Sequence, residues 1–193
     1  MNIQYKLIPM GTSRRSGAKL KSVRRLTAHD TGNPGSTAIQ NVSYYIRSAN
    51  EMSASAHIFV DDKEIICCIP LDEKAWGVRY NCTQDNILFG DDANDVSIQI
   101  ELCYGGRIDN QKAYKNYVEL MAFLCRQYSL NPLKNIDGHF QLDPARRTDP
   151  IGGLKEVGKD WDSFLKDVNN KKNSLSVLLQ IIKLKLSKNE LSY

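Results

Sequence analysis

The sequence contains no long apolar run and no paired-cysteine motif, and both absences narrow the class of protein. No stretch reaches the roughly 20 apolar residues that a transmembrane helix needs. The N-terminal segment, MNIQYKLIPMGTSRRSG, lacks the uninterrupted apolar core of a signal peptide, so we expect synthesis in the cytoplasm and no membrane insertion. Five cysteines, an odd number without CxxC, predict small buried side chains in a protein that folds in a reducing compartment.

Excess basic charge is absent from most of the chain. With 193 residues, 41% hydrophobic and 25% charged, the composition is that of an ordinary globular domain. The formal net charge of +4 comes from residues 171–193, since the preceding 170 residues carry 21 basic and 21 acidic side chains. A neutral body lacks the basic stripe that neutralises phosphates, so we expect no nucleic-acid partner.

Hydrophobic periodicity predicts a domain that mixes helices and strands. Helical spacing of apolar residues appears in three segments: residues 37–50, 112–128 (with Phe123 on the apolar face) and 160–168. Strands are predicted for residues 23–28, 56–60, 64–70 and 96–104, of which the middle two form a β-hairpin. Residues 1–22 are expected to wrap the surface. This order predicts an α/β domain (mixed α+β) around a central sheet.

The C-terminal end is predicted to stand apart from the domain. We expect the domain over residues 1–168 and a basic amphipathic tail over residues 169–193. In the tail, NSLSVLLQIIKLKLS presents apolar residues at helical spacing, although IKLKL also suits a strand. Packing on the domain, homo-oligomer formation through the tail and the start of a binding module are the alternatives, of which we favour the first two.

Two histidines and an aspartate form a candidate metal site. His139 opens GHFQLDPARRTDP, and Asp149 follows ten residues later in a loop stiffened by two prolines. His29 lies where a short apolar run gives way to the turn residues of HDTGNPG. These three ligands would hold Zn²⁺ and leave a fourth position for water. Judged by spacing alone, a structural role for the histidines is the commoner alternative, because no HExxH motif is present.

Four motifs occur together in one order: HDTGNPG, SASAHIFVDD, SIQIELCY and GHFQLDPARRTDP. In this combination the sequence resembles the zinc-dependent N-acetylmuramoyl-L-alanine amidases (amidase type 2), which include T7-lysozyme-like phage endolysins, bacterial autolysins and peptidoglycan recognition proteins. The resemblance covers roughly residues 20–165. It implies a mixed sheet flanked by helices and a Zn²⁺ ion held by His29, His139 and Asp149. The third ligand is usually cysteine in the family, with aspartate a recurrent alternative.

The resemblance also implies two catalytic residues. Glu101, on the polar face of its predicted strand, matches the catalytic glutamate of the phage and bacillary branch and would act as general base. Arg147 stands where related enzymes often carry lysine and would stabilise the oxyanion, with Arg146 as the alternative. Without the resemblance, a solvated glutamate and a surface arginine pair would be the simpler interpretations.

Three further residues are expected at or near the substrate: Asn33 in the first loop, His57 beside or behind the groove, and Trp76 on its border. The sequence departs from the family pattern at two positions. Ala56 replaces a tyrosine that contacts the reacting centre in many relatives, so that role cannot be transferred. Gly77 replaces the histidine that often follows the tryptophan.

The resemblance therefore predicts a hydrolase that cuts peptidoglycan between N-acetylmuramic acid and L-alanine with the help of zinc. The alternatives are a non-catalytic peptidoglycan-binding module on the same fold and a zinc hydrolase of another specificity, such as one acting on anhydro-muropeptides. We expect an endolysin of phage or prophage type that reaches the wall after holin-type release. The tail would then be the remnant of a wall-binding region.

Overall fold

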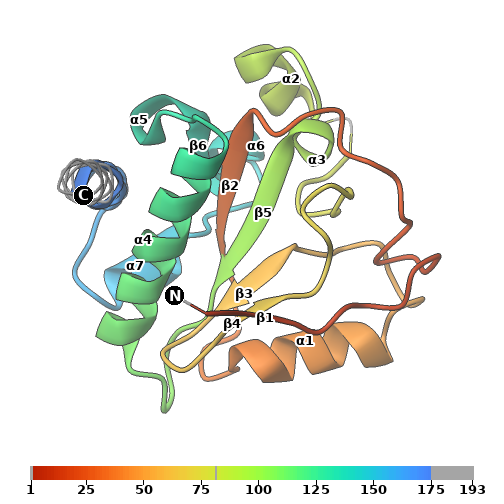
Figure 1. Cartoon of the computed structure of the whole chain (residues 1–193), viewed down its shortest axis with the longest axis horizontal. Coiled ribbons are helices and arrows are strands. Elements are labelled where there is room, and N and C mark those ends of the chain that lie inside the picture. The colour runs from red at the N-terminus through yellow and green to blue at the C-terminus, as the bar shows by residue number, and fades with distance from the viewer. Residues whose placement is uncertain (1, 81, 175–193) are drawn as a thin grey trace, which may run out of the picture.

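A six-stranded mixed sheet forms the centre of the computed structural model, which describes residues 2–80 and 82–174 (Figure 1). Its strands are β1 (Ile3–Tyr5), β2 (Arg25–Asp30), β3 (Ile58–Val60), β4 (Ile65–Cys67), β5 (Ser97–Leu102) and β6 (Ile136–Gly138). They lie in the order β1-β4-β3-β5-β2-β6. β3 and β4 form the predicted antiparallel hairpin, whereas β1–β4, β3–β5, β5–β2 and β2–β6 are parallel pairs.

The central strand β5 is buried on both faces. Ile98, Ile100 and Leu102 point into the hydrophobic core. Ser97 and Gln99, on the opposite face, are just as inaccessible to solvent. The alternating sequence had predicted one apolar face, and it did not reveal that the polar face is also covered. A buried polar face needs internal hydrogen bonds, and this requirement shapes the site described below.

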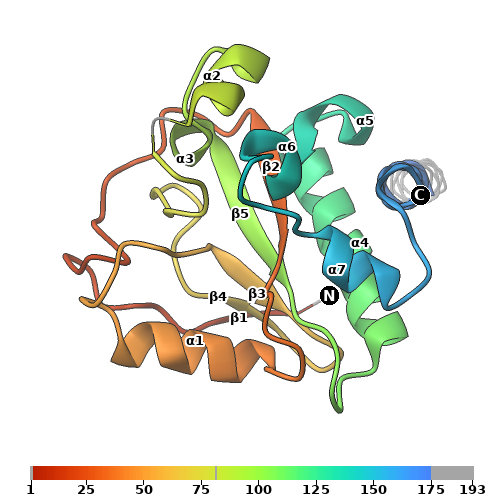
Figure 2. The ribbon, with the colours of Figure 1, turned by 180° about the vertical axis from the view of Figure 1, so that it is seen from behind.

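Helices enclose the sheet from both sides. The long helices are α1 (Ala38–Arg47), α4 (Asn110–Gln127) and one over residues 161–174; the short ones are α2 (Thr83–Phe89), α3 (Ala93–Val96), α5 (Pro132–Asn135), α6 (His139–Leu142) and α7 (Ile151–Lys155). α4 lies on one side of the sheet, and α6 and α7 come to the front when the molecule is turned (Figures 1 and 2). Thr37 and Gln40 form a capping box that starts α1, and Asp109 caps α4.

Tyr117 ties α4 to the central strands. Its hydroxyl donates toward the main-chain oxygens of His29 and Ile100, both at 3.2 Å. Its ring stacks on Phe164 of the helix over residues 161–174, with 5.5 Å between centroids. Through Tyr117, both α4 and the helix over residues 161–174 therefore support β2, the strand that carries His29.

Most predicted elements are confirmed, and four details of the sequence interpretation were wrong. β1 pairs with β4, so residues 1–22 do not merely wrap the surface. His29 and Asp30 belong to β2 rather than to the loop after it. Phe123 is 39% exposed instead of lying on the buried face of α4. The last helix extends to residue 174, beyond the predicted end at 168, and its added turn is held by the ion pair of Lys171 with Glu119 and by the hydrogen bond from Lys172 to the carbonyl oxygen of Leu130.

The prediction of buried cysteines is confirmed for four of the five, whereas Cys82 is half-buried, and all five are free thiols. No helix in the described ranges has both the length and the apolar character required to cross a bilayer. The proposals for the tail concern mainly residues 175–193, which lie outside the described residues.

Candidate active site

The carboxyl ends of three parallel strands bring distant residues together. His29 of β2 lies opposite Glu101 of β5 in the strand register. Ala28 lies opposite Gly138 of β6, so the next residue, His139, emerges beside His29. The carboxyl edge of parallel strands is a common location for ligand sites, because loops and helix starts converge there.

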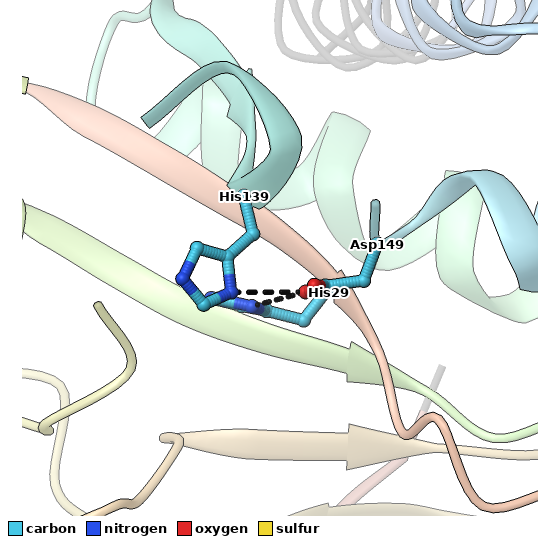
Figure 3. Close-up of side chains that lie close together, drawn as sticks. All are labelled: His29, His139 and Asp149. Carbon is cyan, nitrogen blue, oxygen red and sulfur yellow. Dashed lines mark hydrogen bonds and ion pairs between the residues drawn. The ribbon is translucent and has the colours of Figure 1, made fainter. Parts of the chain in front are cut away.

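His29, His139 and Asp149 point toward one another at this edge (Figure 3). Asp149 Oδ2 lies 2.9 Å from His29 Nδ1 and 3.1 Å from His139 Nδ1. One potential ligand atom from each residue lies within 4.8 Å of the others, and the described part of the chain contains no second cluster of this kind. The amide N–H of Phe140 donates to the carbonyl oxygen of Asp149 at 3.0 Å, which holds the carboxylate beside His139.

The donor set suits zinc. Two imidazole nitrogens and one carboxylate oxygen are ordinary zinc ligands, and three protein ligands leave a position open for substrate or water. His29 and His139 are 2% and 3% exposed, so their rings are fixed by packing. The expected ligand set is thus brought together by β2, the start of α6 and the segment before α7.

Asp149 is held in its anionic form. Burial opposes ionisation, but hydrogen bonds with His139 and His29 outweigh it and lower the pKa of Asp149. Burial also lowers the pKa of His139. Burial by itself would lower the pKa of His29, but the hydrogen bond with Asp149 and the charge of Glu101 outweigh it and raise this pKa to about 9. A bound metal ion would take the place of the proton on His29 Nδ1.

Glu101 lies in the wall of a pocket of about 420 Å³ that also contains the three candidate ligands. Its Oε2 is buried and has no hydrogen-bond partner among the described residues. Burial, together with the charges of Asp149 and Asp30, raises the pKa of Glu101 to about 8, whereas His29 and Arg147 oppose the rise. A carboxyl group with a pKa near neutrality can both accept and release a proton in catalysis.

The two neighbouring arginines differ in their partners. Arg146 forms an ion pair with Asp143, three residues earlier. Arg147 lines the same pocket, and its charge acts on Glu101. We find no ion pair of Arg147 within residues 2–80 and 82–174. Arg146 lines the pocket as well, so the two arginines differ in their ion pairing and not in their access to the pocket.

The three predicted substrate residues occupy different positions. Trp76 lines the pocket, half-buried. Asn33 is exposed in the loop after β2, where its neighbour Gly32, rather than Asn33 itself, reaches the pocket wall. His57 is fully buried, so it presents no surface to a substrate. Of the two positions expected for His57, only the one behind the groove agrees with the structure.

The sequence did not indicate two residues of this region: Tyr45, which lines the pocket, and Arg14, which supports its wall. Tyr45 of α1 lines the pocket and packs edge-on against Phe59, with 5.1 Å between centroids. The buried guanidinium of Arg14 lies 4.2 Å from the centre of the Tyr45 ring. Arg14 also donates hydrogen bonds to the carbonyl oxygens of Ser48 and Ala54, the latter in the pocket wall. Periodicity placed Tyr45 in a helix, and no motif indicated its exposure to the site.

His57 gives the fold a pH dependence of its own. Its Nδ1 accepts the main-chain N–H of Gln99 at 2.9 Å, and its Nε2 lies 2.8 Å from the carbonyl oxygen of Glu73. Burial lowers the pKa of His57 to about 4, against the raising effect of Glu73. In the unfolded chain His57 becomes protonated below about pH 6.5, whereas in the folded protein it stays neutral down to about pH 4. The contribution of His57 to the free energy of unfolding therefore falls as the pH drops through that window.

We expect this one group to cost about 2 kcal/mol of unfolding free energy at pH 5 relative to pH 8. Urea unfolding of the metal-free protein and of His57→Gln, measured between pH 8 and pH 5, checks the value. Between pH 8 and pH 5 the free energy of unfolding of the parent should change unfavourably by this amount relative to that of the variant, whatever the absolute stability of either protein. Parallel pH curves for the two proteins would show that His57 is not the responsible group.

Comparison with known proteins decides the family. The family described as N-acetylmuramoyl-L-alanine amidase (Amidase_2) matches residues 19–152. The chain belongs to this amidase family. Curated relatives include the amidase BlyA of Bacillus subtilis strain 168, 32% identical over 70% of this chain, and CwlL of Bacillus licheniformis, 30% identical over 78%. The present chain spans 39% and 44% of those two proteins.

Solved structures show the same amidase fold. The catalytic domain of XlyA superposes with a TM-score of 0.71 at 26% identity, covering 87% of this chain and 99% of that one. PlyL gives a TM-score of 0.67 at 29% identity, covering 87% and 97%. A mutant endolysin from Bacillus subtilis gives 0.69 at 27% identity, covering 87% and 99%. These matches confirm the resemblance and the mixed α+β fold expected from the sequence.

Proposed function

We propose that this domain is a zinc-dependent amidase that hydrolyses the bond between the lactyl group of N-acetylmuramic acid and L-alanine in bacterial peptidoglycan. The observation that carries the proposal is the convergence of His29, His139 and Asp149 in one pocket with the buried carboxyl group of Glu101. Family membership supports the reaction, and the family members named above are amidases.

The chain's own residues divide the work of hydrolysis. His29, His139 and Asp149 would hold zinc, which supplies Lewis acidity for water and for the scissile carbonyl group. Glu101 removes a proton from the attacking water and delivers it to the departing amine of L-alanine, a double use that its raised pKa favours. Arg147 stabilises the negative charge that develops on the carbonyl oxygen. Trp76 offers an apolar wall to the substrate, and Asn33 an exposed amide near the pocket mouth.

A non-catalytic binding module is the second candidate, and the environment of Glu101 disfavours it. Keeping a carboxyl oxygen buried without a hydrogen bond costs stability, and binding alone gains nothing from that cost. The same reasoning does not separate the proposed amidase from a hydrolase of anhydro-muropeptides, because both would use the same centre. The two differ in whether intact walls are cut.

Our proposals for the rest of the protein follow from the amidase assignment. We propose residues 1–168 as the catalytic domain and bacterial peptidoglycan as its macromolecular partner. For the tail, residues 169–193, we propose a role in self-association or an origin in a wall-binding region. Release at lysis is the proposed route to the wall.

Product analysis tests the assignment directly. Purified bacterial walls treated with the protein should release stem peptides that begin with a free L-alanine amine, leaving glycan strands intact, as read by mass spectrometry. A strong chelator should stop the release and added Zn²⁺ should restore it, because the metal supplies the Lewis acidity. Shortened glycan strands, or cleavage only of soluble anhydro-muropeptides, would contradict the amidase assignment, and full activity in chelator would contradict the role of zinc.

A further inference from the structure

Gln99 is a fully buried amide in contact with His29, and nothing in the proposed reaction uses it. We propose that Gln99 is a positioning residue that fixes the ring of His29 so that Nδ1 faces the metal, and that residue 77 is glycine because the Gln99 side chain fills the space of a side chain there. This inference rests on the proposed zinc site and deepens it.

The His29 ring is held at both nitrogens. Nδ1 lies 2.9 Å from Asp149 Oδ2, on the side of the candidate metal site. Nε2 lies 2.8 Å from Gln99 Oε1 on the other side. An amide oxygen only accepts hydrogen bonds, so Nε2 must carry the proton in this contact. The neutral ring then has its lone pair on Nδ1, the atom that faces the other two ligands.

The direction of the Gln99 amide is itself determined by its neighbours. Its Nε2 lies 2.7 Å from Ser97 Oγ and 3.4 Å from the carbonyl oxygen of Ala93. The Ser97 hydroxyl donates to the same carbonyl oxygen at 2.9 Å, so its oxygen is free to accept from Gln99. Reversing the amide would place its oxygen against the Ala93 carbonyl oxygen, two acceptors without a proton between them. Oε1 is therefore the atom that faces His29.

The main chain of Gln99 is fixed as well. Its N–H donates to His57 Nδ1 at 2.9 Å, and its carbonyl oxygen accepts the N–H of His57 at 2.9 Å. Because Gln99 and Ser97 are 0% exposed, bulk water does not compete for these hydrogen bonds. Supporting partners of this kind set the orientation of metal-binding histidines.

Gly77 is matched to Gln99 in size. A Cβ atom at residue 77 would lie 2.4 Å from Oε1, 2.7 Å from Cδ and 2.8 Å from Cγ of Gln99. These are the three nearest atoms, and all are too close for a real contact. The backbone at Gly77 has none of the positive φ that would itself call for glycine. Space for the Gln99 amide is therefore what residue 77 provides.

Zinc affinity is the decisive measurement, because it does not depend on catalysis. We expect Gln99→Leu, close in volume but without an acceptor, to bind Zn²⁺ about 10- to 100-fold more weakly than the parent in competition with a chromophoric chelator. Asn41→Ala is the control. Asn41 also carries a buried amide, which donates to the carbonyl oxygens of Ser36 and Thr37, but it lies in α1 outside the pocket wall, so the zinc affinity of this variant should stay at the parent value. Thermal unfolding of each metal-free protein shows that it is folded.

A double-mutant cycle isolates the pair. Gly77→Ala should weaken zinc binding in the parent, but should have no further effect in a Gln99→Ala protein, which lacks the atoms that the new Cβ would meet. A folded Gln99→Leu protein with the parent affinity, or an equal effect of Gly77→Ala in both backgrounds, would overturn the proposal. A parent that binds zinc but releases no peptide would refute the amidase function and leave the role of Gln99 intact. A parent that binds no zinc would overturn both.

Discussion

Replacing Glu101 with glutamine is expected to lower the rate of peptide release from purified walls by about 10²- to 10⁴-fold, the usual contribution of a general acid–base group. Glutamine keeps the size of the side chain but can neither take a proton from water nor return one to the amine. Glu101 is not among the three converging ligands, so zinc content should remain at the parent level. The rate and the bound zinc are measured on the same preparation.

Glu64→Gln is the matched control for this substitution. Glu64 lies in the turn between β3 and β4 and takes no part in the pocket. The control should keep the parent rate. A Glu101→Gln protein with the parent rate would remove Glu101 from the mechanism, whereas a protein that has also lost zinc would show that Glu101 supports the metal site instead.

The convergence of the three candidate ligands was partly predictable, because they lie in segments with recognisable local patterns. His29 follows a short apolar run, and His139 and Asp149 lie in a proline-bounded loop. The pairing of β2 with β5 and β6 then converts sequence order into proximity, since parallel neighbours end at the same edge. Spacing alone did not show that this edge holds all three residues. The family resemblance supplied that step.

Buried polar residues were the part that sequence could not predict. Arg14 sits in a segment of glycine, serine and basic residues, which is typical of an exposed loop, yet it is 1% exposed and supports one wall of the pocket. For Gln99, the alternating pattern indicated only a place on the polar face of a strand, and neither its burial nor its contact with His29. Such residues are stable in the interior because of partners far away in sequence, and periodicity carries no information about those partners. The error on Phe123 has the same origin, since what covers a helix face is decided by tertiary packing.

Substitutions of Asp149 test whether zinc binding needs the negative charge of this side chain or only its shape. We expect Asp149→Asn to lose zinc affinity by more than the roughly 100-fold that loss of a supporting residue costs, and to lose wall cleavage with it. Asparagine has nearly the same shape but no charge, so the anion between the two histidines disappears. Competition with a chelator measures the affinity, and peptide release measures the activity.

Asp149→Cys is the informative counterpart, because a thiolate is also an anionic zinc ligand and Zn–S bonds are only about 0.2 Å longer than Zn–O bonds. It should bind zinc at least a hundredfold more tightly than Asp149→Asn and retain wall cleavage, since Glu101 and Arg147 are unchanged. If the asparagine protein kept zinc and activity, the third ligand would have to be sought elsewhere in the pocket. If the cysteine protein bound zinc but did not cleave, the carboxylate would contribute to the reaction beyond holding the metal.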